Sequence, residues 1–307
     1  MKKVLVTGAG GFVGRHLVRK LLAEGLEVWG VVYPGSNIYE GMQDGKLHVK
    51  CLDLSQVMSH VKEFPAGEID TMYHFAWTGV RPELRNNLDV QMANVGMTMD
   101  CMRLAAAIGI QRVVFPGSTN EYLYYGKPLN RDAVPSPSNT YGAAKIVLRY
   151  LCRDFAIQNG ISFIYTIIAG IYAEDRRDNN VIFYTIDRLL RGEKPVLTKL
   201  EQLWDYVYVD DVMEALYLAG EKGKEDGVYA IGHGDNWPLS NYVRIIAEKI
   251  NPALPLGIGE LPYQDGRLPS SCIDLTDIER DTGFRPRVSF EQGISRVIGK
   301  IRADMEK

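Results

Sequence analysis

A glycine-rich segment near the start of the chain constrains the fold more than any other feature. Residues 8–14 read Gly-Ala-Gly-Gly-Phe-Val-Gly and lie between an apolar strand at residues 2–7 and an amphipathic helix. Gly8, Gly11 and Gly14 permit a tight turn and a close approach of the backbone to a pyrophosphate, which the positive end of the helix attracts. The segment therefore predicts a dinucleotide-binding turn; the alternative is a tight strand-to-helix turn that holds no ligand.

Strands and helices alternate through the first half of the chain. After the first strand, short apolar segments predict further strands at residues 27–32, 47–52, 71–76, 112–115 and 162–168. The alternation predicts an α/β fold with a doubly wound parallel sheet of the Rossmann type over residues 1–170. The pattern is looser afterwards, so residues 171–307 are expected to form mainly a smaller mixed substrate-binding lobe. Within that half, residues 203–231 are expected to return to the Rossmann domain.

A tyrosine and a lysine begin a helix directly after a proline-rich loop at residues 135–140. Tyr141 and Lys145 are four residues apart and therefore point the same way. A positive charge beside a phenol favours the phenolate, so Lys145 is expected to lower the pKa of Tyr141. Tyr141 would then donate and accept protons near neutral pH. The alternative is an ordinary solvent-facing pair.

A hydroxyl group is expected near the same reacting oxygen. Ser118, with Thr119 as the second choice, follows the strand at residues 112–115 and is expected at the carboxyl edge of the sheet. The alternative is a turn in which the hydroxyl group hydrogen-bonds the neighbouring backbone.

The end of the strand at residues 27–32 bears on the choice of cofactor. NAD-binding enzymes commonly place an Asp or Glu there for the adenosine ribose, whereas this chain has Tyr33 and Ser36 and no carboxylate. The lack of a repelling carboxylate favours NADP(H) over NAD(H), with Ser36 and Arg15 as candidate contacts for a 2′-phosphate. Further along, Asp53 either meets the adenine edge or caps the helix that follows it.

The strand at residues 71–76 ends in two residues with different expected roles. Small Ala76 leaves room for a cofactor at the carboxyl edge of the sheet, where a bulky side chain would collide with it. His74 is interpreted as a packed strand residue and not as a catalyst.

Composition argues against several classes of function. With 35 Lys and Arg against 38 Asp and Glu, the net charge of −3 gives no basic field for nucleic acid. No apolar run reaches the roughly 20 residues that span a bilayer, and the N-terminus lacks a signal-peptide layout. The 4 cysteines form no Cys-x-x-Cys pair and no metal-ligand cluster. They are expected to be buried thiols of a cytoplasmic protein without a metal site.

Taken together, these motifs resemble the extended short-chain dehydrogenase/reductases, a family of nucleotide-sugar epimerases, dehydratases and reductases. The resemblance covers nearly the whole chain and rests on residues 7–14, Asp53-Leu54, His74-Phe75-Ala76, Asn94, Ser118, Tyr141, Lys145, residues 205–212 and residues 282–286. It implies that the cofactor is held by Gly8, Gly11, Phe12, Val13, Gly14, Tyr33, Ser36, Asp53, Leu54, Phe75, Ala76, Asn94, Tyr141 and Lys145.

The same resemblance implies a mechanism and a substrate. Tyr141 transfers a proton to or from a sugar oxygen, Lys145 lowers the pKa of Tyr141 and holds the nicotinamide ribose, and Ser118 hydrogen-bonds the sugar oxygen. The substrate is expected to be a nucleotide-diphosphate sugar that contacts the second lobe. The residues assigned to it are Trp77, Asn120, Asn180 and Arg267.

Departures from the family pattern reduce the number of reactions that the resemblance allows. The dehydratases carry Asp-Glu directly after the catalytic Thr, whereas Thr119 is followed by Asn120 and Glu121. Dehydration is therefore the least favoured reaction, although Glu121 could act alone. Trp204 stands where an Arg often contacts the diphosphate, so that contact is not expected here. Residues 117–122 and Trp77 resemble the 4-ketoreductases that make CDP-abequose and CDP-paratose.

Three functions remain open after this comparison. The favoured one is an NADPH-consuming reductase of a 4-keto-6-deoxy nucleotide sugar, and the second is an epimerase of the UDP-galactose 4-epimerase type with retained NAD. The third is a non-catalytic NADP-sensing module; such proteins typically lose the tyrosine or the lysine, and this chain keeps both. A homodimer is expected, with its surface on the helix at residues 86–108 and on the helix that Tyr141 begins.

Overall fold

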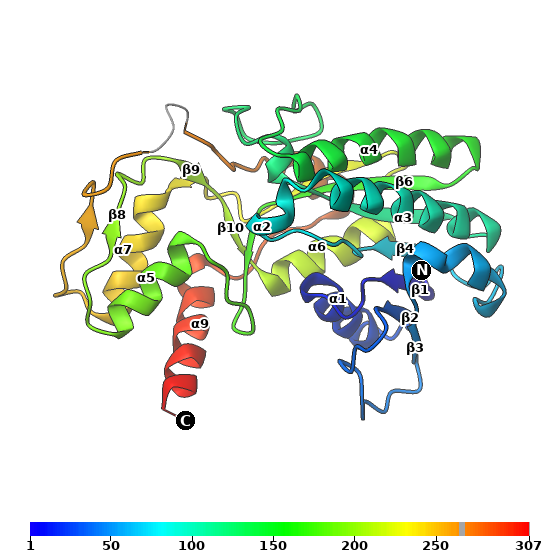
Figure 1. Ribbon diagram of the computed structural model, residues 1–307, viewed down its shortest axis with the longest axis horizontal. Coiled ribbons are helices and arrows are strands. Elements are labelled where there is room, and N and C mark those ends of the chain that lie inside the picture. Colours follow the sequence, from blue (N-terminus) through cyan, green and yellow to red (C-terminus); the bar gives the residue numbers. More distant parts are fainter. Residues whose placement is uncertain (264–267, 307) are drawn as a thin grey trace.

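The computed structural model describes residues 1–263 and 268–306, and a single parallel sheet lies at its centre (Figure 1). Within these residues the sheet has seven strands in the order β11-β6-β5-β4-β1-β2-β3. They are β1 (Lys3–Thr7), β2 (Glu27–Val32), β3 (Leu47–Cys51), β4 (Thr71–His74), β5 (Arg112–Ser118), β6 (Ser162–Ile168) and β11 (Val228–Ile231). Every neighbouring pair is parallel, which confirms the predicted doubly wound α/β fold.

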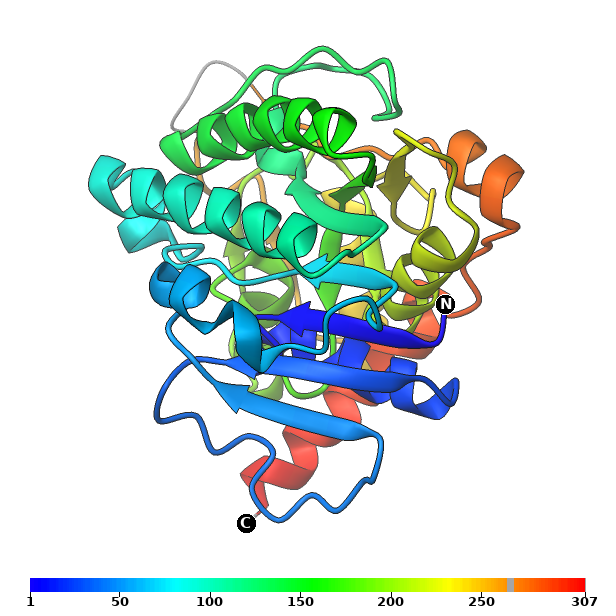
Figure 2. The ribbon, with the colours of Figure 1, turned by 90° about the vertical axis from the view of Figure 1, so that its right-hand side faces the viewer.

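Helices cover both faces of this sheet. Helices α3 and α4 pack against each other on one face, and α1 and α6 pack together on the other (Figure 2). The helices of the described residues are α1 (Phe12–Ala23), α2 (Pro82–Arg85), α3 (Leu88–Ala107), α4 (Thr140–Gln158), α5 (Val181–Leu190), α6 (Val209–Lys222), α7 (Leu239–Ile250), α8 (Thr276–Thr282), α9 (Phe290–Met305) and the short 3-10 helices η1 (Leu54–Glu63) and η2 (Thr119–Glu121). The core lies between these layers, where strand residues such as Leu5 and Val113 are completely buried.

The second half of the chain builds a separate lobe, seen at the left of Figure 1. Helix α7 packs against both α5 and α9 there. Three two-stranded pairs accompany them: β7 (Gly170–Tyr172) with β10 (Tyr206–Tyr208), β8 (Val196–Leu197) with β13 (Gly257–Ile258), and β9 (Leu203–Trp204) with β12 (Trp237–Pro238). Between these segments, α6 and β11 lie with the main sheet, and the assignment of residues 203–231 to the Rossmann domain stays a prediction. The boundary at residue 170 remains our proposal for the division into domains.

Capping side chains determine where the helices near the sheet edge begin. Asn139 accepts a hydrogen bond from Gly142 N at 2.8 Å and so begins α4 directly after the loop that contains Pro135 and Pro137. Tyr141 and Lys145 therefore lie in the first two turns of this helix. Their backbone is fixed both by the cap and by the packing of α4 on the sheet.

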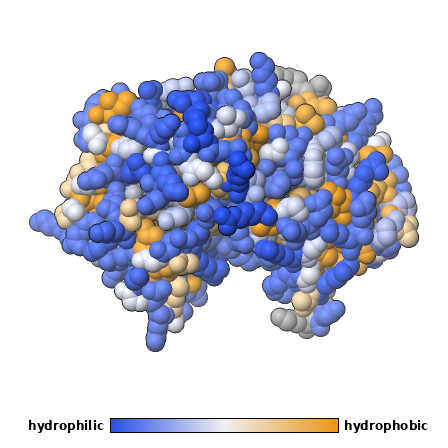
Figure 3. Space-filling model, turned by 180° about the vertical axis from the view of Figure 1, so that it is seen from behind, coloured by the Kyte–Doolittle hydropathy of each residue, from blue (hydrophilic) through white to orange (hydrophobic). Residues whose placement is uncertain are grey.

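The surface is mainly hydrophilic where it is seen from behind in Figure 3, with apolar residues in small separate groups. The outline in that view is hollowed along its lower edge, between the lobe that carries α9 and the rest of the molecule. Across residues 1–263 and 268–306, none of the helices has the length and apolar character that crossing a membrane requires.

Candidate functional site

Three strands of the sheet end beside one another and bring their loops together. Neighbouring β1, β4 and β5 end at Thr7, His74 and Ser118, and in a parallel sheet these ends share one edge. The contact is close, because a Cβ at Gly8 would lie 2.5 Å from the backbone nitrogen of Ala76. The glycine-rich turn after β1 and the Phe75-Ala76 segment after β4 are therefore adjacent, as a shared cofactor site requires.

The glycine-rich turn leaves no room for side chains. Gly8 has a φ of +68°, and a Cβ at Gly14 would lie 2.2 Å from the carbonyl oxygen of Gly8. Gly11 is the N-cap of α1 and brings no capping side chain, so the first N–H groups of the helix, from Phe12 and Val13 onward, have no side-chain partner there. These features fit the pyrophosphate of a dinucleotide, which needs a close backbone approach and a helix N-terminus.

Ser118 and Tyr141 meet at the carboxyl edge of the sheet. Tyr141 is 9% exposed, and a hydrogen bond between its hydroxyl group and Ser118 favours its ionised form. Burial outweighs that effect and raises the pKa of Tyr141 to about 12. The phenol therefore stays protonated at neutral pH, which suits a proton donor. Our expectation that Lys145 lowers this pKa was wrong for the structure described here.

Lys145 makes its close polar contact with the backbone of β5. Its Nζ donates a hydrogen bond to the carbonyl oxygen of Pro116 at 2.9 Å and lies 5.9 Å from the centroid of the Tyr141 ring. The side chain is 3% exposed, and burial lowers the pKa of Lys145 to about 7. The geometry explains the error above, because the four-residue spacing places the two side chains on one face but does not determine where the long lysine chain ends.

Trp77, in the loop after β4, contacts both Tyr141 and Lys145. Its ring lies 3.8 Å from Lys145 Nζ and meets Tyr141 edge-on, with 5.6 Å between the ring centroids. The indole Nε1 donates to Gln91 Oε1 at 3.0 Å, and Gln91 is completely buried in α3. Gln91 Nε2 in turn donates to Gly79 O at 3.1 Å. Gln91 was not anticipated from the sequence, since no local pattern identifies a buried glutamine as the anchor of a loop.

The turn after β5 holds Ser118 in a fixed network. Ser118 Oγ accepts hydrogen bonds from the backbone and side-chain nitrogens of Asn120, at 3.2 Å and 3.0 Å. Asn120 Oδ1 accepts from Asn139 at 3.1 Å, which connects this turn to the start of α4. Thus the local turn that we weighed as an alternative does form, and the hydroxyl hydrogen of Ser118 remains available. Thr119 is buried beside it and is 7% exposed.

Several cofactor candidates make structural contacts in the described chain. Asp53 Oδ1 accepts from Ser55 N at 3.0 Å and so caps η1, the second of the two roles that we considered. Asn94 is buried in α3 and makes hydrogen bonds with both backbone groups of Thr78, at 2.9 Å and 2.8 Å. It therefore secures the loop after β4. A direct contact of either side chain with the cofactor stays a prediction.

The remaining adenosine-side candidates lie around the end of β2. Tyr33 is 72% exposed, and Leu54 is buried at the start of η1. The Oγ of Ser36 lies 3.1 Å from where a Cβ on Gly10 would be, so Ser36 is next to the glycine-rich turn. These positions are compatible with the predicted site, and their cofactor contacts remain predictions.

Arg15 is engaged with a residue that is distant in sequence. Its guanidinium donates to Asp175 Oδ2 at 2.9 Å, and His16 Nε2 lies 3.0 Å from the same oxygen. Arg176, next to that aspartate, lies over the ring of Phe12 at 4.4 Å. Arg15 therefore pairs with the loop after β7, and it is not the free phosphate contact that the sequence suggested. The separation of 160 residues explains why local reasoning missed the pair.

The substrate candidates of the second lobe are only partly described. Asn180 is the N-cap of α5, where its Oδ1 accepts from Phe183 N at 3.2 Å. Arg267 lies outside the described residues. His74 makes hydrogen-bond contacts with Thr7 Oγ1 at 2.7 Å and Thr98 Oγ1 at 3.0 Å, and burial lowers its pKa to about 3. It is a neutral packed residue, in agreement with our interpretation.

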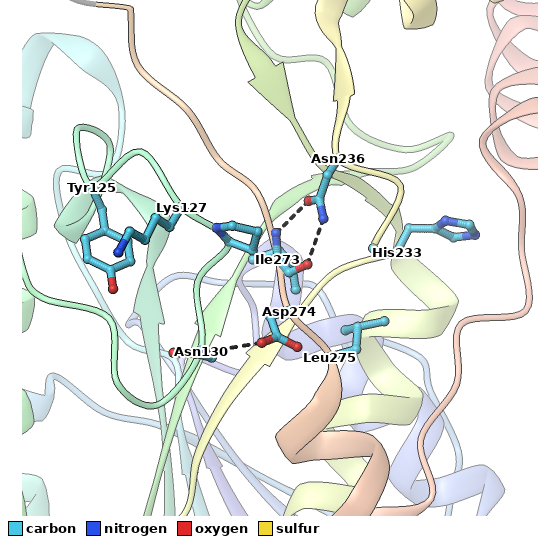
Figure 4. A pocket seen from close by; sticks show the side chains of 10 residues that line it. Tyr125, Lys127, Asn130, His233, Asn236, Ile273, Asp274 and Leu275 are labelled. Carbon is cyan, nitrogen blue, oxygen red and sulfur yellow. Dashed lines mark hydrogen bonds between the residues drawn. The ribbon is translucent and has the colours of Figure 1, made fainter.

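A separate cavity of about 580 Å³ lies away from these residues (Figure 4). It is lined by Tyr125, Lys127, Pro128, Asn130, His233, Gly234, Asn236, Ile273, Asp274 and Leu275. Asn236 makes two hydrogen bonds with the backbone of Ile273, at 2.7 Å and 2.9 Å, and Asn130 Nδ2 donates to Asp274 Oδ2 at 3.2 Å. None of the described residues that the sequence predicted for the site lines this cavity.

Comparison with known proteins agrees with the fold. Residues 4–232 match the model of the NAD-dependent epimerase/dehydratase family. The dTDP-4-dehydro-6-deoxyglucose reductase of Escherichia coli is 24% identical, and the alignment covers 97% of each chain. UDP-glucuronic acid decarboxylase 5 of Arabidopsis thaliana is 26% identical over 95% of this chain and 87% of that protein. The crystal structure of UDP-glucose 4-epimerase with UDP-glucose from Thermotoga maritima has a TM-score of 0.81, with 24% identity and 99% of both chains covered.

Proposed function

Because the chain belongs to the NAD-dependent epimerase/dehydratase family, we propose that it reduces the 4-keto group of a nucleotide-diphosphate 4-keto-6-deoxy sugar. The family match covers residues 4–232, and the relatives include a nucleotide-sugar reductase and a decarboxylase. Membership confirms the resemblance to extended short-chain dehydrogenase/reductases and makes the protein an enzyme that depends on a nicotinamide cofactor.

The proposal rests on one observation, the convergence of Ser118, Tyr141 and Lys145 beside the glycine-rich turn. The glycine-rich turn would hold the pyrophosphate of a nicotinamide cofactor, which would supply the hydride for the carbonyl carbon. Tyr141 donates its phenolic proton to the carbonyl oxygen, and Ser118 hydrogen-bonds the same oxygen. Lys145 supplies positive charge near the oxygen as it becomes an alkoxide. The ketone thereby becomes a secondary alcohol.

The hydrogen bonds of Glu121 support reduction over dehydration. Glu121, which we considered as a lone dehydrating group, is completely buried, and its oxygens accept from Ser118 N at 2.6 Å and from the Tyr165 hydroxyl group at 2.8 Å. Neither oxygen is presented to a sugar. The raised pKa of Tyr141 also favours a donor over an acceptor of protons, which is the role that reduction requires.

Trp77 and Asn120 are proposed as the nearest sugar contacts. Trp77 already lies against Tyr141 and Lys145, so a sugar that reaches the tyrosine hydroxyl group would pass its ring. Aromatic rings bind the apolar faces of sugars through the same burial that stabilises protein cores. Asn180 and Arg267 are proposed to bind the nucleotide diphosphate from the second lobe, as the family resemblance implies.

NADP(H) is proposed as the preferred cofactor. The end of β2 carries Tyr33 and no carboxylate, so nothing there repels a 2′-phosphate. Ser36 lies beside the glycine-rich turn and is the proposed phosphate contact. Arg15 is no longer part of this proposal because it pairs with Asp175.

The purified protein is expected to oxidise NADPH steadily only when a 4-keto-6-deoxy nucleotide sugar is present. NADPH is expected to show a higher kcat/KM than NADH. The assay follows loss of reduced cofactor and identifies the product by mass spectrometry, with the corresponding 4-hydroxy sugar as the matched control substrate. Interconversion of two sugars with a tightly retained cofactor and no net change in NAD(P)H would contradict the reductase and establish the epimerase.

A homodimer formed through α3 and α4 is proposed as the working state. Exposed apolar residues recur at helical spacing on both helices: Leu88 (62%) and Met92 (56%) on α3, and Val147 (47%), Tyr150 (54%) and Leu151 (44%) on α4. The two helices lie side by side (Figure 2), and we propose that these exposed residues contribute to a surface that a second copy covers. On the inner side of α3, Met102, Leu104 and Ala105 are buried, whereas Met97 and Met99 are only partly buried.

The double variant Met92→Glu with Leu151→Glu is expected to convert the dimer to monomer, because association would bury two unpaired carboxylates on each copy. Native mass spectrometry gives the number of chains. Lys300→Glu, on the exposed side of α9, is the control and is expected to leave the number of associated chains unchanged. A wild-type protein that is monomeric at micromolar concentration would contradict the proposed interface.

A further inference from the structure

A buried carboxylate lies directly behind the catalytic residues. Glu121, the last residue of η2, is 0% exposed. Its Oε1 accepts from Ser118 N at 2.6 Å, while Ser118 Oγ accepts from Asn120 N at 3.2 Å, and the two contacts form a capping box. Its Oε2 accepts from the hydroxyl group of Tyr165 at 2.8 Å. The carboxylate therefore fixes the backbone of the residue whose hydroxyl group meets Tyr141.

The capping box alone does not explain why a carboxyl group stands at this position. A glutamine completes such a box equally well, and this chain uses one at the start of α9, where Gln292 pairs with Ser289. An ionised carboxylate in the interior is unfavourable unless cations compensate it. A carboxyl group at this position therefore indicates a role beyond the cap.

Two cations of α4 lie near the carboxylate. Lys145 Nζ donates to the carbonyl oxygen of Pro116, two residues before Ser118, and Arg149 lies 5.2 Å from the ring of Tyr165, whose hydroxyl group donates to Glu121. Lys145 and Arg149 both favour the ionised form of Glu121, and among the groups that act on Lys145 it is Glu121 that most favours its ammonium form. The close contacts of the ammonium group are uncharged: Pro116 O at 2.9 Å and the rings of Trp77 and Phe115 at 3.8 Å and 4.5 Å. The other titratable groups around this pair are Tyr122 after η2, Tyr141 and Cys152 on α4, Tyr165 on β6 and His74 on β4.

Burial acts on both members of the pair in opposite directions. It raises the pKa of Glu121 to about 7 and lowers the pKa of Lys145 to about 7. Each group loses its charge readily without the other, because an opposite charge nearby is what favours the ionised form. Arg149 is turned toward neutral partners, since it donates to the Tyr122 hydroxyl group at 2.6 Å and lies 5.2 Å from the Tyr165 ring.

We propose that Glu121 is a positioning residue of the catalytic set, which holds the Ser118 turn in place and serves as the buried counter-ion that keeps Lys145 an ammonium group. This role rests on the functions proposed above for Ser118 and Lys145. Glu121 does not touch the substrate; it acts through the other two residues. One side chain thereby couples the geometry of the hydroxyl donor to the charge of the lysine.

The decisive variant is Glu121→Gln, which keeps the shape and the capping bond and removes the charge. Protein with ¹⁵N-labelled lysine is titrated by NMR without substrate or added cofactor, and the Lys145 Nζ signal is assigned by its loss in Lys145→Met. Lys145 is expected to deprotonate about 1–3 pH units lower in Glu121→Gln than in the wild type, the usual effect of an adjacent opposite charge. The fall of kcat/KM at rising pH is expected to move in the same direction.

Two further variants keep the test decisive. Asp154→Asn removes an exposed carboxylate from the same helix and is expected to leave the Lys145 titration unchanged. If Glu121→Gln fails to fold, Tyr165→Phe removes the hydroxyl group that stabilises the Glu121 charge, and a smaller shift in the same direction is expected. An unshifted Lys145 in the folded variant overturns the proposal. Because the NMR titration needs no substrate, a shifted lysine in a protein that reduces no ketosugar would refute the proposed reaction and leave this role standing.

Discussion

Replacing Tyr141 with phenylalanine is expected to lower kcat by about 10²–10⁴-fold, the usual contribution of a positioned proton donor. The change removes only the hydroxyl group, so the ring keeps its edge contact with Trp77 at 5.6 Å, and α4 keeps its Asn139 cap. Proton donation matters in the transition state and not in substrate binding, so KM is expected to change far less than kcat. Steady-state rates with NADPH and the 4-keto-6-deoxy nucleotide sugar measure both constants.

The matched control is Tyr217→Phe on α6. Tyr217 is half-buried and lies outside both the proposed site and the proposed dimer surface, so its hydroxyl group is expected to contribute nothing to turnover. Urea unfolding of both variants separates a loss of chemistry from a loss of fold. A Tyr141→Phe protein that turns over at the wild-type rate would show that another group supplies the proton.

Much of the fold could be predicted because local pattern and tertiary environment agree. The strands at 27–32 and 162–168 have the bounds that their apolar runs indicate. The fifth strand is longer than expected, since it continues through Pro116 and Gly117 to Ser118. Proline normally ends a central strand, but here the pairing with β6 persists as far as Ser118 opposite Ile168. The carbonyl oxygen of Pro116 is then free to accept from Lys145.

The candidate site divides into contacts that sequence spacing determines and contacts that only the fold creates. The four-residue spacing placed Tyr141 and Lys145 in the first turns of one helix, as observed. The placement of Lys145 over Trp77 depends on a loop from another strand, and the pairing of Arg15 with Asp175 joins segments 160 residues apart. No local pattern encodes such contacts. The same holds for the burial of Glu121, whose Ser-x-x-Glu spacing indicates a capping box but not an interior charge.

Replacing Gly14 with alanine is expected to distort the glycine-rich turn of the cofactor site. The new Cβ would lie 2.2 Å from the carbonyl oxygen of Gly8 and 2.9 Å from the Cα of Ala9, and neither backbone atom can move without opening the turn. Overpacking of this kind costs about 1–3 kcal/mol. If the cofactor-bound state carries a free-energy cost of the same size, the Kd of the cofactor rises about 10–100-fold. Urea unfolding gives the first quantity, and fluorescence titration with NADPH gives the second.

Gly299→Ala in α9 is the control that separates the clash from the general effect of the substitution. A Cβ at Gly299 meets nothing within 4 Å, so alanine there is expected to stabilise the helix by about 0.5–1 kcal/mol. The two variants make the same chemical change inside a helix and differ in what the added methyl group meets. Opposite signs in their free energies of unfolding would therefore isolate the contact between Gly14 and Gly8. If Gly14→Ala were as stable as the wild type and bound NADPH with unchanged Kd, the close approach of α1 to the first strand would not be what shapes the cofactor turn.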